Sequence, residues 1–239
     1  MVSGYNLRMS SPSPVKPNIL ALIPAFNEEV GVADVIHGAS KYLPVLVVDD
    51  GSHDRTAQIA EEAGAVVLRQ VPNQGKGAAM RAGFQYALQN GYAGVITLDA
   101  DRQHNPDEIP IFFDCYTQTQ ADLIIGARDF RKMPIVRRCS NTIGRVMFSW
   151  ALGQKDRDNQ SGYRFISNRL MEKLIGSTER GFEFEVEMLA VCVKLGYRLE
   201  WVTIQTIYAG EKSHIVPLRH IVNWFRIIAK TRRIMRTSN

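Results

Sequence analysis

Along the first 130 residues, short apolar runs alternate with longer segments of mixed polarity. The apolar runs are rich in Val, Ile and Leu, which is typical of strands buried on both faces of a parallel sheet. The mixed segments carry helix-start signals: Asp54 and Asn105 are suited to N-caps, and Pro106 to a first turn. This alternation predicts a parallel sheet covered by helices on both faces. We expect strands at 19–23, 45–48, 65–68, 95–98 and 121–128, and helices at about 28–42, 54–63, 75–90 and from 106 onward.

Past Phe130 the regular alternation ends. We expect amphipathic or helical segments at about 134–152, 183–195 and 216–236, and extended segments at 161–166 and 198–207. Residues 1–17 contain two Ser-Pro pairs and few apolar anchors, so we expect a disordered tail. The chain therefore divides into this tail, one α/β domain at 18–214, and a basic amphipathic C-terminal helix at 215–239.

Composition narrows the class of protein. Of the 239 residues, 45% are hydrophobic and 22% are charged, as in an ordinary globular domain. No apolar run approaches the roughly 18 residues that a membrane-spanning helix requires, and no signal peptide is visible. The three cysteines, Cys115, Cys139 and Cys192, lack metal-ligand spacing. These features indicate a reduced, cytoplasmic protein.

The net charge of +5 gathers at the C-terminal end, because no acidic residue follows Glu211. On a helical wheel the basic residues of this end fall on one stripe beside a broad apolar face. Such a helix binds an anionic membrane surface, or it packs on the domain with its basic stripe in solvent; the sequence leaves both open. No nucleic-acid-binding motif is present. The stripe consists of Arg219, Arg226, Lys230 and Arg233.

Three predicted strands end in polar residues, at 24–29, 49–52 and 99–101. The carboxyl ends of neighbouring parallel strands meet at one edge of a sheet, where ligands bind. Asp99 and Asp101 would lie close together there, and a hard divalent cation relieves the repulsion of two such carboxylates. An Asx-rich turn is the alternative for either aspartate taken alone. Together, the three strand ends favour a nucleotide diphosphate held through a metal ion.

Basic residues near this edge favour an anionic ligand. Asn73 and Lys76 lie in a glycine-rich loop at a helix start, where backbone N–H groups favour an anion. The loop lacks the P-loop spacing, and no dinucleotide fingerprint follows the first strand. Arginine binds phosphate through its planar fork, although a solvated helix face is the simpler account for at least two of the five arginines here. These arginines are Arg128, Arg137, Arg138, Arg145 and Arg164.

Six short motifs follow one another along the chain. They span Ile23–Glu29, Val48–Asp54, Asn73–Gly77, Asp99–Pro106, Gly126–Arg128 and Gln160–Arg164. Together, in this order, they resemble the motifs of glycosyltransferase family 2, in the branch of the polyprenol (dolichol) phosphate mannose synthases. The resemblance covers about residues 18–214, and Asp99-Ala100-Asp101 followed by Gln103-His104 is its most specific part. It implies the glycosyltransferase A (GT-A) fold, a single nucleotide-binding α/β domain.

The resemblance also implies roles for individual residues. Asp99, Asp101 and Gln103 would hold Mg²⁺ or Mn²⁺ against the diphosphate of a nucleotide-sugar, with Ala100 beside it. Arg128 would face the donor or acceptor phosphate, and Lys212 would lie on a lid loop. Arg137 or Arg138, with Ser140, are the candidates for acceptor binding, together with Arg164. The expected nucleotide contacts are Pro24, Phe26, Glu28, Val48, Asp50, Asn73 and Lys76.

The expected reaction is inverting transfer of a sugar to a lipid-linked phosphate such as polyprenyl phosphate. The mannose synthases carry an arginine where this chain has Thr206, so the donor stays open between GDP-mannose, UDP-glucose and similar compounds. A hydroxyl acceptor would require a base, for which Glu183, Glu185 and Glu187 are candidates. A nucleotide-sugar-binding protein without activity is a further alternative, whereas a nucleotidyltransferase would carry a different first loop. We expect a cytoplasmic enzyme bound peripherally at the inner face of the membrane through residues 216–236.

Overall fold

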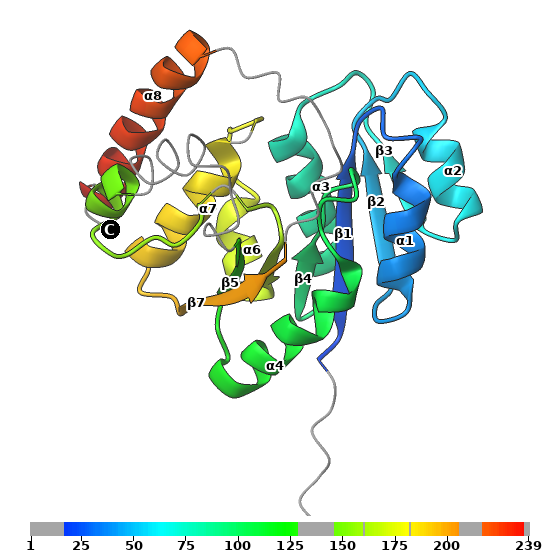
Figure 1. Ribbon diagram of the computed structural model, residues 1–239, viewed down its shortest axis with the longest axis horizontal. Coiled ribbons are helices and arrows are strands. Elements are labelled where there is room, and N and C mark those ends of the chain that lie inside the picture. The colour runs from blue at the N-terminus through cyan, green and yellow to red at the C-terminus, as the bar shows by residue number, and fades with distance from the viewer. Residues whose placement is uncertain (1–16, 129–145, 160, 182, 206–216, 237–239) are drawn as a thin grey trace, which may run out of the picture.

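The computed structural model describes residues 17–128, 146–159, 161–181, 183–205 and 217–236 (Figure 1). Seven strands form one sheet in the order β3-β2-β1-β4-β6-β5-β7. All neighbouring pairs are parallel except those of β6, which runs antiparallel to both β4 and β5. The strands are β1 (Ile19–Ala25), β2 (Val45–Asp49), β3 (Val66–Arg69), β4 (Gly94–Thr97), β5 (Leu123–Arg128), β6 (Arg164–Ser167) and β7 (Leu199–Ile204).

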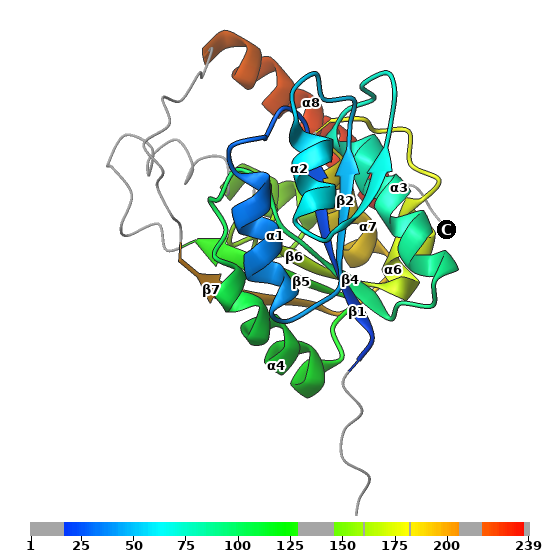
Figure 2. The ribbon, with the colours of Figure 1, turned by 90° about the vertical axis from the view of Figure 1, so that its right-hand side faces the viewer.

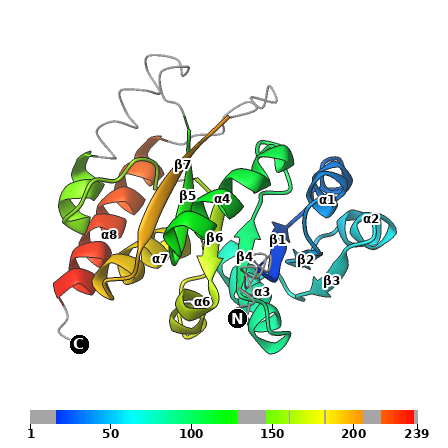
Figure 3. The same cartoon turned by 90° about the horizontal axis from the view of Figure 1, so that it is seen from below.

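Helices cover both faces of the sheet, as the alternation predicts (Figures 2 and 3). In β1, Ile19, Ala21 and Ile23 point into the core beneath α1 and α4, whereas Leu20 and Leu22 point into the core beneath α3, α6 and α7. This two-sided burial follows from the period of two in a strand. The helices are α1 (Val32–Ser40), α2 (Thr56–Glu62), α3 (Lys76–Gln89), α4 (Ile109–Thr119), α6 (Asn168–Leu174), α7 (Glu183–Lys194) and α8 (Pro217–Arg236).

One local expectation, the end of the first strand, differs from the structure. β1 does not end before Pro24 but continues to Ala25, with Pro24 paired to Val48 of β2. Pro24 follows Leu22 by two residues, and the Leu22 carbonyl faces β4 and accepts from Leu98 N–H. The missing N–H of Pro24 therefore faces the space beyond the end of β4, where no ladder bond is lost.

The two predicted cap residues both accept the expected kind of bond. Asn105 caps a 3₁₀ turn, η1 (Pro106–Glu108), that leads into α4, and its side chain accepts from Asp107 N–H at 3.1 Å. Asp54 lies one residue before the N-cap of α2, and its carboxylate accepts from Thr56 N–H at 2.9 Å. The segment predicted as a helix at 134–152 is helical at 146–152; its earlier part lies outside the described residues.

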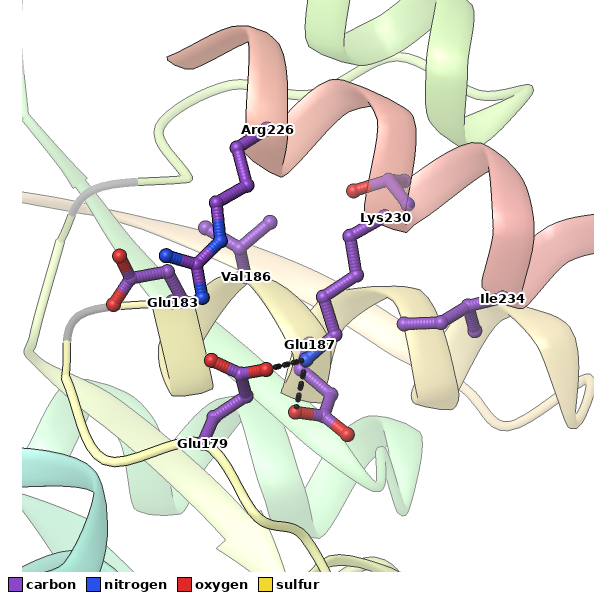
Figure 4. Close-up of a pocket in the computed structure, with 8 residues that line it drawn as sticks. Glu179, Glu183, Val186, Glu187, Arg226, Lys230 and Ile234 are labelled. Carbon is purple, nitrogen blue, oxygen red and sulfur yellow. Dashed lines mark hydrogen bonds and ion pairs between the residues drawn. The ribbon is translucent and has the colours of Figure 1, made fainter. Parts of the chain in front are cut away.

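The C-terminal helix α8 packs on α7 instead of standing apart from the domain. Ile228 and Thr231 are buried against it, with 7% and 1% of their surface exposed. Lys230, expected on the outer basic stripe, points inward: its Nζ lies 2.5 Å from Glu179 Oε1 and 2.9 Å from Glu187 Oε2 (Figure 4). The cavity between the two helices is only about 10 Å³, too small for a ligand.

Arg233 and Arg236 are exposed on α8. Arg226 is also exposed, but its side chain reaches toward Glu183 of α7 and lines the cavity between the two helices (Figure 4). Arg232 stacks on Trp150 of the helical segment 146–152, with its guanidinium carbon 3.8 Å from the ring centre. Trp150 is itself 61% exposed. Within the described part of the chain, no helix is both long and apolar enough to span a bilayer.

Candidate active site

The reversed direction of β6 determines which residues meet Asp99. β4 ends at Thr97, just before Asp99, and the segment that enters β6 passes beside this end. The Thr97 hydroxyl donates to the Gly162 carbonyl at 2.6 Å, which ties the two segments together. A Cβ on Gly162 would lie 2.7 Å from Asp99 Oδ2, so only glycine leaves room for that carboxylate.

Asp99 is paired with a lysine from the glycine-rich loop. Lys76 Nζ lies 2.6 Å from Asp99 Oδ1 and 2.9 Å from Glu185 Oε1, so its ammonium bridges two carboxylates. Burial by itself would raise the pKa of Asp99, but the charge and hydrogen bond of Lys76, together with the other basic groups nearby, outweigh burial and hold that pKa at about 2. Burial likewise opposes the charge on Lys76, yet Asp99 and Glu185 together raise the pKa of its ammonium. Asp99 and Lys76 are therefore both charged at neutral pH.

His104 orients the start of the Asp99-Ala100-Asp101 motif. Its Nδ1 accepts from Asp99 N–H at 3.0 Å, and its Nε2 lies 3.9 Å from Asp99 Oδ2. Burial lowers the pKa of His104, which keeps the imidazole neutral. Because Nδ1 accepts a hydrogen bond, we assign the proton to Nε2, on the side of the Asp99 carboxylate.

A cavity of about 100 Å³ opens in front of Asp99. Ser161 is one of its lining residues, and the Ser161 hydroxyl is buried and has no hydrogen-bond partner among the described residues. A buried hydroxyl without a partner is costly, so this position favours a polar ligand. The residues that line the cavity are Asp99, Gln103, His104, Arg128, Ser161, Gly162, Ile204 and Gln205.

The residues expected to hold a metal ion lie in one turn at this cavity. Asp101 Oδ1 accepts from Gln103 N–H at 3.0 Å, and both side chains are partly exposed. Two carboxylates and an amide oxygen are hard donors, which suit Mg²⁺ or Mn²⁺. No group of three or more His, Cys, Asp or Glu side chains with metal-ligand geometry occurs among the described residues. Among the described residues, the cation in contact with Asp99 is the Lys76 ammonium. The turn itself has the oxygen donors that a divalent metal ion requires.

Asp50, which follows β2, binds backbone N–H groups of the loop before α3. It is 3% exposed, and its two oxygens accept from Gln74 N–H at 2.8 Å and from Gly75 N–H at 2.7 Å. Gly75 has φ of +94°, and a Cβ there would collide with the Arg180 carbonyl. The loop conformation that places Lys76 therefore depends on both Asp50 and Gly75.

The other expected nucleotide contacts differ in how accessible they are. Phe26 is 42% exposed and meets His53 edge-on at 6.3 Å between ring centres, so its ring is accessible to a base. Asn73 is exposed and Glu28 is half-buried. Pro24 and Val48 are buried, so only their backbone atoms are placed to meet a ligand.

The two described arginines of the expected acceptor group have different surroundings. Arg128 lines the cavity and is oriented by Asp158, with Nε and Nη2 at 2.7 Å and 2.9 Å from the carboxylate oxygens. Arg164 does not line the cavity; it is 0% exposed and donates to three backbone carbonyls, those of Ser161, Glu185 and Asn159. Its position does not fit acceptor binding. Arg137, Arg138, Ser140, Lys212 and Thr206 lie outside the described residues.

Four residues of the site were not predicted as ligands or positioning residues: His104, Ser161, Gly162 and Gln205. Gln205 follows β7, and its N–H donates to Glu108 Oε1 at 2.8 Å, joining the cavity to η1. The spacing along the sequence gave no signal for Gln205. Ser161 and Gly162 belong to a motif of the resemblance, but only the reversed strand places them beside Asp99.

The contact between Gln205 and Glu108 can be tested through the pH dependence of stability, because the Glu108 carboxyl is buried. Burial raises the pKa of its carboxyl, against the lowering effect of the Gln205 N–H, and Oε2 is buried without a partner among the described residues. The folded pKa lies above the unfolded value of about 4.3, so the stabilising contribution is complete below that value and is lost as pH rises through the folded pKa. Relative to Glu108→Gln, wild type should lose free energy of unfolding as the pH rises above about 4. Urea denaturation at each pH measures this.

Glu108→Gln keeps the oxygen that accepts from Gln205 N–H, so the bond between η1 and β7 survives in the variant. Glu172→Gln, on the exposed face of α6, is the control and should follow wild type at every pH. A constant difference between Glu108→Gln and wild type across the range would show that Glu108 does not titrate with a raised pKa.

The family comparison agrees with this arrangement. The family model described as "Glycosyl transferase family 2" matches residues 21–175, which include the ends of β1, β2, β4 and β5. This chain belongs to glycosyl transferase family 2. It is therefore a glycosyltransferase, and the sequence resemblance is confirmed.

Relatives of this family 2 enzyme act on different sugars. The chain is 30% identical to the polyprenol monophosphomannose synthase of Mycolicibacterium smegmatis, over 81% of this chain and 79% of that protein. It is 28% identical to the UDP-N-acetylglucosamine–dolichyl-phosphate N-acetylglucosaminyltransferase of Methanococcus voltae, over 80% and 86% of the two chains.

A solved structure agrees with the fold. Glucosyl-3-phosphoglycerate synthase of Mycobacterium tuberculosis, in complex with Mn²⁺, UDP-glucose and phosphoglyceric acid, superposes with a TM-score of 0.72. The match covers 93% of this chain and 81% of that one at 21% identity, so it concerns the fold alone. The expected GT-A fold of the family 2 domain is confirmed.

Proposed function

We propose that this family 2 glycosyltransferase transfers a sugar from a nucleotide-sugar to a lipid-linked phosphate, with inversion and with help from a divalent metal ion. The observation that carries the proposal is the cavity lined by Asp99, Arg128 and Ser161, whose buried hydroxyl has no hydrogen-bond partner among the described residues. It combines a metal-binding edge with a cation and a hydroxyl suited to phosphate oxygens. The names of the two relatives, both acting on a polyprenol or dolichyl phosphate, support this acceptor class.

Each residue has a role in this mechanism. Asp99, Asp101 and Gln103 would hold the metal ion, which when bound neutralises the leaving diphosphate. Asp50 and Gly75 hold the loop that places Lys76 at the N-terminus of α3, where an anion is stabilised. Phe26 offers its exposed ring to the nucleotide base. Arg128, oriented by Asp158, would bind a donor or acceptor phosphate.

A phosphate acceptor needs no strong base, because it is already anionic near neutral pH. The three glutamates considered as bases for a hydroxyl acceptor are poorly placed for that role. Glu185 is 5% exposed and ion-paired with Lys76, and Glu187 accepts from the Ser177 hydroxyl and pairs with Lys230. Glu183 begins α7, where acidic residues are stabilised by the helix dipole. This favours the phosphate acceptor over the hydroxyl acceptor.

The same proposal includes a peripheral contact with an anionic membrane, at which a lipid-linked acceptor would be met. Its surface is the exposed face of α8, with Arg233 and Arg236, beside the exposed Trp150. Basic residues are attracted to anionic lipids, and aromatic rings settle at the headgroup level. Lys230 does not belong to this surface, since it is directed toward α7.

A transfer assay with the full chain tests the function. Vesicles carry polyprenyl phosphate in anionic or neutral lipid, and GDP-mannose, UDP-glucose and UDP-N-acetylglucosamine are compared with Mn²⁺, Mg²⁺ or EDTA. We expect one donor to yield polyprenyl-phosphate sugar, with activity lost in EDTA and with pelleting of the protein on anionic vesicles only. Vesicles with polyprenol that lacks the phosphate are the control. Equal transfer to the alcohol, or donor binding without any transfer, would overturn the proposal.

A further inference from the structure

The Lys76 ammonium lies where a divalent cation would contact Asp99. Its Nζ is 2.6 Å from Asp99 Oδ1, and within the described chain no other cation lies as close to this carboxylate. The side chain is 19% exposed and that of Asp99 is 28% exposed, so the pair is reached from the cavity. A divalent ion bound to the same oxygen would be held close to a positive charge and repelled by it.

We propose that Lys76 occupies the cation position beside Asp99 while no nucleotide is bound, and yields it to a divalent ion when a diphosphate draws the ammonium away. This rests on the proposed function, and it adds an order of events to it. The metal ion binds the free enzyme weakly, and the diphosphate and the metal ion favour each other's binding. By linkage, each raises the affinity for the other by the same factor.

Glu185 provides the anchor for this movement. Its carboxylate lies 2.9 Å from Lys76 Nζ and is 5% exposed, so leaving it unpaired would be costly. The ammonium keeps this contact and exchanges Asp99 for a phosphate oxygen. The Arg164 guanidinium, which is fully buried and donates to the Glu185 carbonyl, supplies a second positive charge on the inner side of the cluster.

The backbone around Lys76 stays in place during the exchange. Asp50 binds the two preceding N–H groups, and the Gly77 N–H donates to the Arg180 carbonyl at 2.7 Å. Lys76 is the first residue of α3, a helix of 14 residues, so its ammonium and the helix N-terminus attract the same anion. The movement therefore involves only rotations of the four-carbon side chain.

Mn²⁺ binding to the full chain, followed by the electron paramagnetic resonance signal of free Mn²⁺, tests the inference without sugar or acceptor. Lys76→Met should bind Mn²⁺ about tenfold more tightly than wild type in the absence of nucleotide. Lys76→Arg, which restores the charge, should bind as weakly as wild type. Arg81→Met is the matched control on the same helix: it removes a positive charge whose guanidinium contacts the Glu179 carbonyl, and it should change the affinity less than twofold.

The second measurement adds saturating GDP or UDP. In wild type one of them should tighten Mn²⁺ binding at least tenfold, and in Lys76→Met this factor should shrink because part of the gain is already present. Circular dichroism checks that the variants are folded. If Lys76→Met does not fold, the Mn²⁺ affinity of Lys76→Arg still tests the inference. Equal Mn²⁺ affinities for nucleotide-free wild type and Lys76→Met, or tight binding by Lys76→Arg, would overturn the inference. Sugar transfer could still occur in that case, so the two proposals fail separately.

Discussion

Asp101→Asn is expected to lower kcat/KM for sugar transfer about a thousandfold, which corresponds to about 4 kcal/mol of transition-state stabilisation. Asparagine keeps the oxygen that accepts from Gln103 N–H, so the turn after β4 should be retained. What is lost is a negative charge at the metal-binding edge, and with it the neutralisation of the leaving diphosphate. The measurement is initial rates across donor concentrations at saturating Mn²⁺, with the donor that the panel identifies.

The matched control for this variant is Asp107→Asn, on the exposed turn η1. Asp107 contacts Tyr42 and Lys41 at the surface and takes no part in the cavity, so its removal should leave kcat/KM within twofold. If Asp101→Asn keeps more than a tenth of the wild-type activity with EDTA-sensitive kinetics, Asp101 is not a metal ligand and the donor set has to be sought elsewhere.

Arg164→Met is expected to lower the free energy of unfolding by about 3–5 kcal/mol. The guanidinium is completely buried and donates to the carbonyls of Asn159, Ser161 and Glu185, at 2.8, 2.7 and 2.5 Å. Methionine replaces the volume but removes the guanidinium donor from all three carbonyls. Urea denaturation followed by circular dichroism measures the loss.

Arg157→Met, on the exposed segment before Asp158, is the control and should stay within about 0.5 kcal/mol of wild type. The result that would contradict this account is unchanged stability of Arg164→Met together with a raised KM for polyprenyl phosphate. That outcome would restore acceptor binding as the role of Arg164.

The parallel part of the fold follows from the sequence because the physical signals there are local. Each of β1 to β5 is a short, largely apolar run bounded by turn residues. Burial on both faces accounts for the run in β1, β2, β4 and β5, whereas β3 lies at the edge of the sheet and is only partly buried. The direction of β6 has no such signal: an apolar strand buried on both faces has the same pattern whichever way it runs. The continuation of β1 through Pro24 was missed for a related reason, since it depends on where the neighbouring β4 ends.

For the site, the sequence predicted which residues would meet a ligand more reliably than it predicted the partners of those residues. Asp99 and Lys76 were both expected to meet the donor, but their direct ion pair joins segments 23 residues apart and depends on tertiary packing. Glu185 completes that pair from α7, far along the chain. Arg164 and Lys230 illustrate the opposite error: both were judged by charge as groups facing a ligand or solvent, whereas their partners are buried backbone carbonyls and helix carboxylates.

The reversal of β6 also bears on how the protein is made. In the described sheet β4 and β5 are not neighbours; each pairs with β6, which is synthesised after both. During synthesis, β1 to β4 can assemble early, while β5 waits for residues 164–167 to leave the ribosome. A nascent chain stopped before that point would expose two apolar strand edges, a state prone to aggregation. Since the segment that closes this gap also carries Ser161 and Gly162 to Asp99, the joining of β4 to β5 and the placement of these two residues occur in the same step.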